Sequence, residues 1–245
     1  FSYIRGDFVY CPFFLVQFRV IVRSIFSINY PRIMQNACEW GNIRNNIWLV
    51  VIVMQAREFF AMALNIKDEK IISDVADASS FVHIPQGEVL LKEGELKQEM
   101  WFLVNGIIRF FYFDVNGREI TDCFVATPRM PIMARPKLLL PSAVYIEASI
   151  DSDLFSIPAQ EIDRLLNQYS ELLQLYNNVL MDAFTMHWEI KTMVCRNTAM
   201  QRYQWFLEAY PGFIDKVSNK HIASFLGMTP VTLSRLRRVL REKEG

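Results

Sequence analysis

The side chains best suited to chemistry lie near the C-terminal end of the sequence, where four arginines occur within seven positions. A guanidinium group donates hydrogen bonds in a planar fork that fits phosphate oxygens and the major-groove edge of guanine. Hydroxyl groups and a lysine nearby add contacts to phosphate, which position a protein on DNA without choosing a base. We therefore predict a surface for double-stranded DNA that consists of Lys220, Thr229, Thr232, Ser234, Arg235, Arg237, Arg238 and Arg241.

A pair of short helices is expected to carry these side chains. Ser218 can cap a first helix, and Gly227 permits the left-handed backbone of a tight turn after it. Thr229 can cap a second helix, with Pro230 at its first position, where an N–H group would have no helical partner. Leucines at helical spacing give the second helix a buried stripe and leave the arginines outward. The pattern is typical of a helix-turn-helix, and Arg235 lies about two turns inside the second helix, within reach of a base edge.

The charge distribution supports a separate basic unit. The 245 residues carry 26 basic and 26 acidic side chains, so the formal net charge is zero. Residues 218–245 nevertheless hold six basic and two acidic side chains, whereas residues 61–217 hold 14 and 21. Such asymmetry indicates that one part of the chain meets a polyanion. A hydrophobic content of 52% excludes an intrinsically disordered chain.

A long helix is predicted over residues 169–197, and a shorter one over residues 198–210 separates it from this basic unit. The apolar residues of the long helix alternate at spacings of four and three, which is a heptad pattern typical of helix pairing. We interpret this face as the seam of a homodimer, made by Leu172, Tyr176, Val179, Ala183, Met186, Ile190 and Met193. The alternative is that the same face packs on the chain's own β-domain, and both hold if the opposite face pairs with a second copy.

The middle of the chain predicts a small antiparallel β-domain. From Ser80 onward the hydrophobic period changes from helical to two, and short strands follow at regular spacing. Asn105-Gly106 and Asn116-Gly117 separate strand-like segments, and Asn-Gly is a strong hairpin signal because both residues tolerate positive φ. The spacing indicates a sandwich or a barrel-like roll.

Residues 1–53 are harder to place in this organisation. They contain two apolar runs, but neither reaches the roughly 20 residues that a membrane-spanning helix needs. A secretory signal is also not legible, so we predict a cytoplasmic protein without a membrane partner. Two interpretations stay open: a genuine extension, or a reading frame extended upstream of a start at Met54, which we favour.

The sequence contains no recognisable metal-binding or catalytic motif. The four cysteines are far apart, which predicts reduced thiols, and the three histidines are isolated, so we expect neither a zinc site nor any other metal. No G-x-S-x-G motif or Cys–His pairing is found. The prediction is that the protein is not an enzyme.

The order of these elements resembles the Crp/Fnr family of bacterial transcription regulators. The segments that carry the resemblance are residues 84–95, 102–109, 114–121 and 221–240, which read IPQGEVLLKEGE, FLVNGIIR, DVNGREIT and HIASFLGMTPVTLSRLRRVL. The resemblance implies an α+β protein with an N-terminal β-roll of the cyclic-nucleotide-binding type (a double-stranded β-helix, residues 54–168), a dimerisation helix (169–197) and a winged-helix-type helix-turn-helix domain (198–245). It also implies a homodimer whose recognition helices enter successive major grooves, and RNA polymerase as a possible partner.

Two departures limit what the resemblance implies. The positions where family members hold the ribose and phosphate of cyclic AMP carry Met130-Pro131 and Pro141-Ser142, so the charged partners are missing. We therefore expect no cyclic nucleotide and no cofactor, and the recognition helix reads Pro230-Val231-x-x-x-Arg235 in place of the usual Arg-Glu-x-x-x-Arg. A different small-molecule effector would use Arg129, Arg135, Lys137 and Ser142, although the simpler interpretation of these charges is an exposed loop.

The function predicted from the sequence is a sequence-specific, homodimeric DNA-binding transcription regulator whose effector is unknown. The alternative is a ligand-binding regulatory module whose basic C-terminal region contacts another protein and no DNA.

Overall fold

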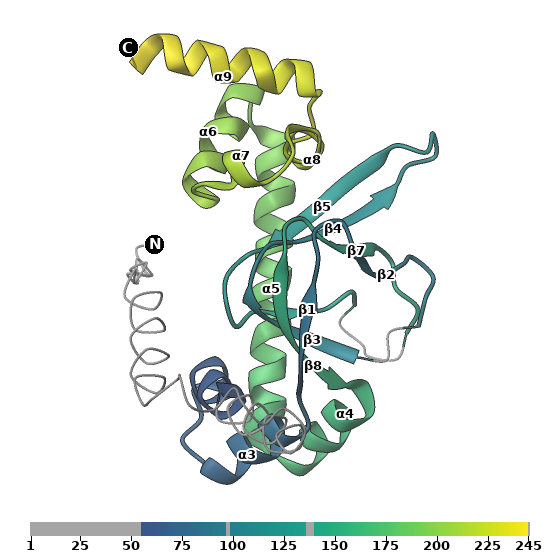
Figure 1. Cartoon of the computed structure of the whole chain (residues 1–245). Coiled ribbons are helices and arrows are strands. Elements are labelled where there is room, and N and C mark those ends of the chain that lie inside the picture. Colours follow the sequence, from purple (N-terminus) through teal and green to yellow (C-terminus); the bar gives the residue numbers. More distant parts are fainter. Residues whose placement is uncertain (1–54, 97–98, 136–139, 245) are drawn as a thin grey trace, which may run out of the picture. The chain divides into compact units, whose positions relative to one another are not determined.

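The computed structural model describes residues 55–96, 99–135 and 140–244 (Figure 1). All the described residues belong to one compact unit. The predictions for residues 1–53 and for Lys137 therefore lie outside the described residues.

Two helical segments precede the strands. Residues 55–64 are helical, and α3 (Glu69–Asp77) follows after a short turn. The Asp68 carboxylate caps α3 by accepting hydrogen bonds from the backbone N–H groups of Lys70 and Ile71, at 2.8 and 3.3 Å. Both segments bury apolar side chains, Phe60 and Val75 among them, in one cluster with residues of the β-roll.

The β-domain consists of two four-stranded antiparallel sheets. One sheet has the order β1-β8-β3-β6, with β1 (Ser80–Ile84), β8 (Ser152–Pro158), β3 (Glu99–Asn105) and β6 (Pro131–Ile132). The other has the order β2-β7-β4-β5, with β2 (Val89–Leu91), β7 (Tyr145–Ala148), β4 (Ile108–Phe113) and β5 (Glu119–Val125). Strands that are distant in sequence lie side by side in both sheets, as in a jelly roll. The predicted α+β fold with a β-roll is confirmed.

The predicted turns are present, and one of them requires glycine. Gly106 has φ of 122°, and a Cβ atom at this position would clash with the Ser152 side chain. Ser152 Oγ accepts a hydrogen bond from the Ile107 backbone N–H at 3.3 Å, so the turn after β3 is bonded to β8. The second hairpin joins β4 to β5, and Asp114 Oδ1 accepts from the backbone N–H groups of Asn116 and Arg118.

Helices make up the rest of the described chain. They are α4 (Ala159–Gln168), α5 (Ser170–Arg196), α6 (Ala199–Ala209), α7 (Phe213–Lys216), α8 (Asn219–Phe225) and α9 (Pro230–Glu244). Figure 1 shows α5 running from α4 past the strands to the C-terminal helices. The short helix α7 was not predicted from the sequence, and no strand occurs between residues 159 and 244.

Two apolar clusters hold these elements together. The larger joins the interior of the roll to α6, α8 and α9, and includes Phe124, Phe206 and Phe225. The smaller joins the first two helical segments to β3, β8 and α4. Across the described ranges, no helix is both long enough and apolar enough to cross a membrane.

Candidate nucleic-acid interface

The helix-turn-helix has the caps that its sequence predicts. Ser218 Oγ accepts a hydrogen bond from the His221 backbone N–H at 3.3 Å, at the start of α8. Thr229 Oγ1 accepts from the Thr232 backbone N–H at 3.1 Å and so caps α9. Gly227 between the helices has φ of 60°, in the left-handed region. The two helices therefore begin and end where short polar side chains and glycine allow it.

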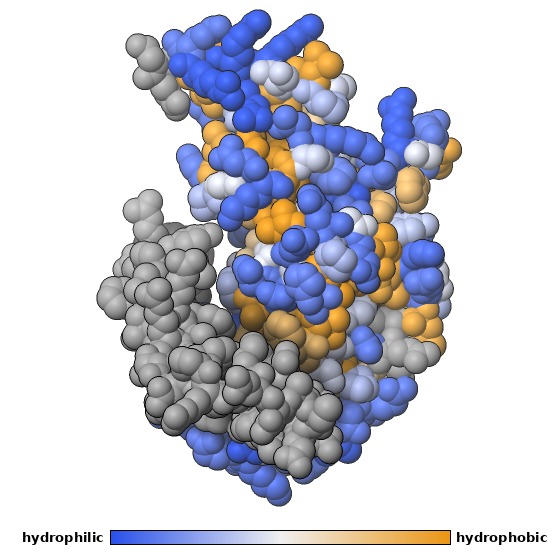
Figure 2. Space-filling view, viewed as in Figure 1, coloured by the Kyte–Doolittle hydropathy of each residue, from blue (hydrophilic) through white to orange (hydrophobic). Residues whose placement is uncertain are grey.

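One face of α9 is held by the apolar core, which fixes the direction of the opposite face. Leu233 is fully buried, and Leu236 and Leu240 are partly buried against the larger cluster. On α9 and at its cap, the exposed predicted contact residues are Thr229, Ser234, Arg235, Arg238 and Arg241. Hydrophilic residues accordingly gather over α9 in the space-filling view (Figure 2). The structure thus brings these five side chains to one accessible surface.

The other predicted contact residues have partners within the protein. Thr232 and Arg237 are half-buried at the edges of the exposed face. Arg237 Nη1 donates to Asn219 Oδ1 at 2.8 Å and thereby links α9 to α8. Arg235, in contrast, has no side-chain hydrogen bond or ion pair within residues 55–244 as described, so its guanidinium group is available to a ligand.

Lys220, the last predicted contact residue, is bonded to the β-roll. Its Nζ donates to Glu119 Oε1 of β5 at 3.2 Å. The same helix docks on the same strand through Ser224, whose Oγ accepts from the Thr121 N–H at 2.9 Å and donates to the Glu119 carbonyl at 3.0 Å. The Glu119 carboxylate therefore binds the Lys220 ammonium group, which was predicted from the sequence to contact a DNA phosphate.

A buried arginine organises this contact. Arg109 is 1% exposed, and it donates to Glu147 at 2.7 Å, to Glu119 at 3.1 Å and to Thr121 at 3.3 Å. Its guanidinium group also lies 4.0 Å from the centroid of the Phe111 ring. A buried charge is tolerated only when it is paired in this way. Sequence reasoning missed Arg109, although an arginine inside the apolar run of β4 was a signal.

His221 completes the charged group. Its ring nitrogens lie 3.8 Å from Glu119 and 3.9 Å from Glu147. Burial and the neighbouring Arg109 guanidinium lower the pKa of His221 below its usual value. Burial alone would raise the pKa of Glu119, but the hydrogen bonds from Lys220 and Arg109 outweigh it and lower that pKa. We call Arg109, Glu119, Glu147, Lys220 and His221 the charged contact.

The predicted effector residues do not converge on one site. Arg129 has a positive φ of 74°, and its Nη1 lies 3.4 Å from the Met62 sulfur. Arg135 is exposed in a loop, which agrees with the simpler interpretation of this charge. Ser142 is buried, and its hydroxyl donates to the Val144 carbonyl at 2.6 Å. No hydrogen bond or ion pair joins any two of these three described residues.

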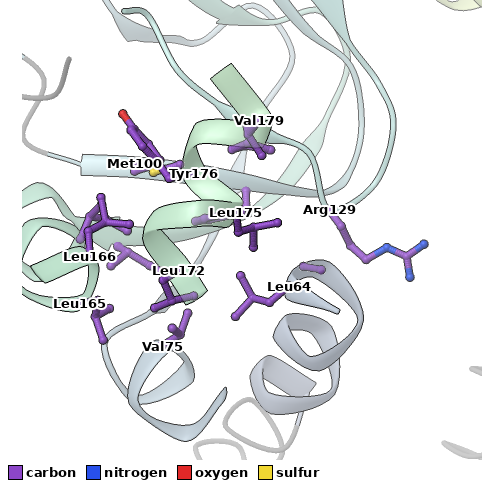
Figure 3. Close-up of a pocket in the computed structure, with 15 residues that line it drawn as sticks. Leu64, Val75, Met100, Arg129, Leu165, Leu166, Leu172, Leu175, Tyr176 and Val179 are labelled. Carbon is purple, nitrogen blue, oxygen red and sulfur yellow. The ribbon is translucent and has the colours of Figure 1, made fainter. Parts of the chain in front are cut away.

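A pocket does occur, but its lining is apolar. It has a volume of about 80 Å³, and its walls include Leu64, Val75, Leu172 and Tyr176. Arg129 lies at the edge, and Figure 3 shows its guanidinium group pointing away from the other side chains. The pocket therefore offers little to the phosphate of a nucleotide.

The predicted dimer seam lies on the face of α5 that packs toward the chain's own core. Leu172, Ile190 and Met193 are buried in the chain's own core, and Met186 and Tyr176 pack against it half-buried. Val179 lines the apolar pocket, and Ala183 is half-buried. At least part of the heptad face thus packs on the chain's own core, as the alternative interpretation held, and pairing through this face stays a prediction.

The opposite face of α5 is apolar and exposed. Phe184 and Trp188 are 64% and 60% exposed, and their rings stack with centroids 6.5 Å apart. Exposed apolar side chains at this helical spacing are typical of an interaction surface. We call this set the α5 stripe, and it consists of Leu173, Met181, Phe184 and Trp188.

Comparison with known proteins agrees with this architecture. Residues 81–169 match the family model of the cyclic nucleotide-binding domain. No curated protein sequence matches the chain significantly. The β-roll is therefore of the type that its strand order and sequence resemblance indicated.

Solved structures extend the agreement beyond the roll. FixK2 from Bradyrhizobium japonicum matches with a TM-score of 0.62 at 17% identity, over 68% of this chain and 86% of its own. The c-di-GMP-responsive global regulator CLP from Xanthomonas campestris matches with 0.59 at 13% identity, over 72% and 93%. A structure from Eubacterium rectale, assigned to the crp/fnr family of transcriptional regulators, matches with 0.59 at 18%, over 76% and 88%. The resemblance to Crp/Fnr regulators is confirmed at the level of the fold.

Proposed function

We propose that the protein is a homodimeric transcription regulator that binds double-stranded DNA through α9 and acts in the cytoplasm. The observation that carries the proposal is a capped helix whose apolar side is buried and whose arginine-bearing side is exposed. A helix of this kind fits the major groove, where arginine reads guanine and contacts phosphate. Two of the structural neighbours are described as regulators, CLP as a global regulator and the Eubacterium rectale protein as a transcriptional regulator of the crp/fnr family, which favours a regulatory over a catalytic role.

The roles of the individual side chains follow from their exposure. Arg235 is exposed without a protein partner and is placed to contact a base edge. Arg238, whose Nε lies 3.8 Å from Glu242, and Arg241 lie about one and two turns further along the same face, and we assign both to phosphate. Arg237 is bonded to Asn219 and acts by holding α9 on α8.

Replacing Arg235 by alanine tests the assignment. We expect Arg235→Ala to weaken binding to a selected genomic fragment by about 1–3 kcal/mol, or roughly 5- to 150-fold, and to reduce the preference over random duplex. The measurement is fluorescence anisotropy with both duplexes. Arg164→Ala is the matched control, because Arg164 is an exposed arginine on α4, paired with Glu161. If the wild-type protein binds neither duplex, the proposal fails, and the alternative is that α9 binds another protein.

We assign the homodimer to the α5 stripe. Two copies that pair through it would remove the exposed Phe184 and Trp188 rings from water, and aromatic side chains are prominent in protein interfaces. Replacing both by glutamate is expected to halve the sedimentation mass, because burying carboxylates there would be costly. Val115→Glu, at the fully exposed turn between β4 and β5, is the control. An unchanged mass in the double variant would place the dimer interface elsewhere.

The charged contact supplies a route for regulation. Glu119 holds Lys220 on the roll side of α8, so a DNA phosphate must compete with that carboxylate for the ammonium group. A ligand or partner that shifts β5 would alter this competition and thus the affinity for DNA. The effector that we propose is not a cyclic nucleotide, because Met130-Pro131 and Pro141 replace the charged groups that would hold one. RNA polymerase is the proposed partner on the promoter.

A further inference from the structure

Three potential metal ligands meet between β5 and the middle of α5. The donor atoms of Asp122, Cys123 and His187 all lie within 4.8 Å of one another, and His187 Nδ1 is 3.9 Å from Asp122 Oδ2. They form the one such group within the described part of the chain. None of the three belongs to the charged contact or to the exposed face of α9, so this cluster has no role in the function proposed above.

A β-bulge explains how two neighbouring residues of one strand share a site. In a regular strand, successive side chains point to opposite faces of the sheet. Here Phe110 pairs with Cys123 while Phe111 pairs with Thr121, so Asp122 has no partner on β4. A bulge of this kind re-aims a side chain and is often found next to functional sites. The Cys123 sulfur and a carboxylate oxygen of Asp122 lie within 4.8 Å of each other, so both side chains face the same region.

The donor set selects the class of ion. Thiolate, imidazole and carboxylate together suit zinc and similar first-row transition metals, whereas magnesium and calcium prefer oxygen ligands alone. Donors of a tetrahedral zinc ion, with bonds of about 2.0–2.3 Å, lie roughly 3.3–3.8 Å apart. The separation of 3.9 Å between His187 and Asp122 is close to that spacing, so a small movement of side chains would close the site.

The site is accessible from one side and closed on the other. The Asp122 and His187 side chains are 36% and 48% exposed, whereas Cys123 is buried. An ion can therefore enter from solvent and reach the thiol last, with the Cys123 S–H proton released to water as the metal–sulfur bond forms. Three protein ligands leave a fourth position for water.

We propose that Asp122, Cys123 and His187 bind a divalent transition metal of the zinc type, which ties β5 to α5. His187 precedes Trp188 of the α5 stripe, and Asp122 is three residues from Glu119 of the charged contact. Metal binding would thus connect the strand that holds α8 to the helix that carries the stripe. The metal site does not depend on DNA binding, and its test uses no DNA.

Cobalt(II) is the probe, because a cobalt–thiolate bond gives a charge-transfer absorption that carboxylate and imidazole alone do not. The full-length protein is reduced, stripped with a chelator and titrated with cobalt, and we expect one equivalent to produce this band and zinc to abolish it. His187→Ala is expected to weaken the affinity more than about 100-fold, beyond the 10- to 100-fold effect typical of groups outside the coordination sphere. Cys123→Ser is expected to lose the band.

The matched controls are the other described cysteine and histidines. Cys195→Ser removes an exposed thiol of α5, and His83→Ala removes an imidazole that is paired with Asp153. Both variants should titrate as the wild-type protein does. Because Cys123 is buried, His187→Ala at the surface decides the outcome if Cys123→Ser does not fold. A wild-type protein without the band, a band that survives in Cys123→Ser, or an unchanged affinity in His187→Ala would overturn the proposal.

Discussion

The β-roll meets helices in two regions of opposite chemistry. At one, which we call the apolar contact, residues 55–64, α3 and α4 pack on β3 and β8 through side chains such as Phe60, Phe102 and Phe155. At the other, the charged contact, α8 meets β4, β5 and β7 through Arg109, two carboxylates, Lys220 and His221. The same small domain therefore uses two kinds of interface.

The two contacts suit different roles: the apolar contact suits stable attachment, and the charged contact suits regulation. Burial of apolar surface is non-directional and little affected by salt or pH, so the apolar contact suits a permanent attachment. Ion pairs that are partly exposed are screened by salt and change with protonation, and phosphate can replace a carboxylate in them. The charged contact lies where the proposed DNA-binding helices join the roll, so a reversible interface is placed between the two domains.

The largest effect is expected from breaking the apolar contact. Phe60 is fully buried, with its ring 5.3 Å from Phe102 and 5.5 Å from Phe155 between centroids. Phe60→Ala should lower the free energy of unfolding by about 3–5 kcal/mol, because it removes apolar burial and leaves a cavity. The measurement is denaturant unfolding at low and high salt, and the loss should be the same in both. Phe81→Ala is the control, since Phe81 is 42% exposed and should lose much less.

The two regions also differ in how well the sequence predicted them. Local signals predicted the elements: α5 (Ser170–Arg196) lies within the predicted range 169–197, and the caps at Ser218 and Thr229 are present. The seam on α5 stays a prediction, because a heptad pattern identifies the apolar face of a helix but not what covers it. Leu172, Ile190 and Met193 of that face are buried in the chain's own core, whereas the α5 stripe is exposed.

Long-range contacts account for most of the residues that were missed. Arg109, Glu119 and Glu147 lie on three strands, and only the sheet order places them together. Asp122 and Cys123 are far from His187 in sequence, and a bulge brings them into one group. The spacing of these residues along the sequence therefore predicted neither the charged contact nor the group of potential metal ligands. Residue types at regular spacing predicted helices and hairpins, but not the side chains that meet between them.

A smaller effect is expected from weakening the charged contact. Glu119→Gln removes the negative charge that holds Lys220, so we expect the affinity for DNA at low salt to rise about two- to fivefold, the range of a partly exposed ion pair. The gain should shrink as salt increases, because the wild-type pair is already screened. Anisotropy titrations over a range of salt concentrations measure both effects.

Glu161→Gln is the matched control for this charge. Glu161 pairs with Arg164 on α4 and does not contact the helix-turn-helix, so its loss should leave the affinity for DNA unchanged. An equal gain in both variants would mean that the effect comes from net charge alone. Weaker binding by Glu119→Gln would show that the carboxylate positions Lys220 for DNA instead of competing for it.

The smallest effect is expected on the pH dependence of stability, through His221 of the charged contact. Its sign follows from the direction of the pKa shift. The pKa of His221 is lowered in the folded protein, so the unfolded chain takes up this proton first as the pH falls below about 6.5. The contribution of His221 to stability is therefore full above that pH and declines below it. His221→Gln should make the fall in stability on acidification shallower, measured as the difference in unfolding free energy from wild type.

His83 provides a control of opposite sign. The hydrogen bond to Asp153 raises the pKa of His83, so its contribution is full at low pH and is lost as the pH rises through the folded pKa. His83→Gln should therefore make the fall in stability on acidification steeper, while His221→Gln makes it shallower. If both variants moved the profile in the same direction, the environment of His221 would not be the one that Arg109, Lys220 and the two carboxylates create. Opposite shifts would confirm that the charged contact lowers the pKa of His221, whereas the pairing with Asp153 raises the pKa of His83.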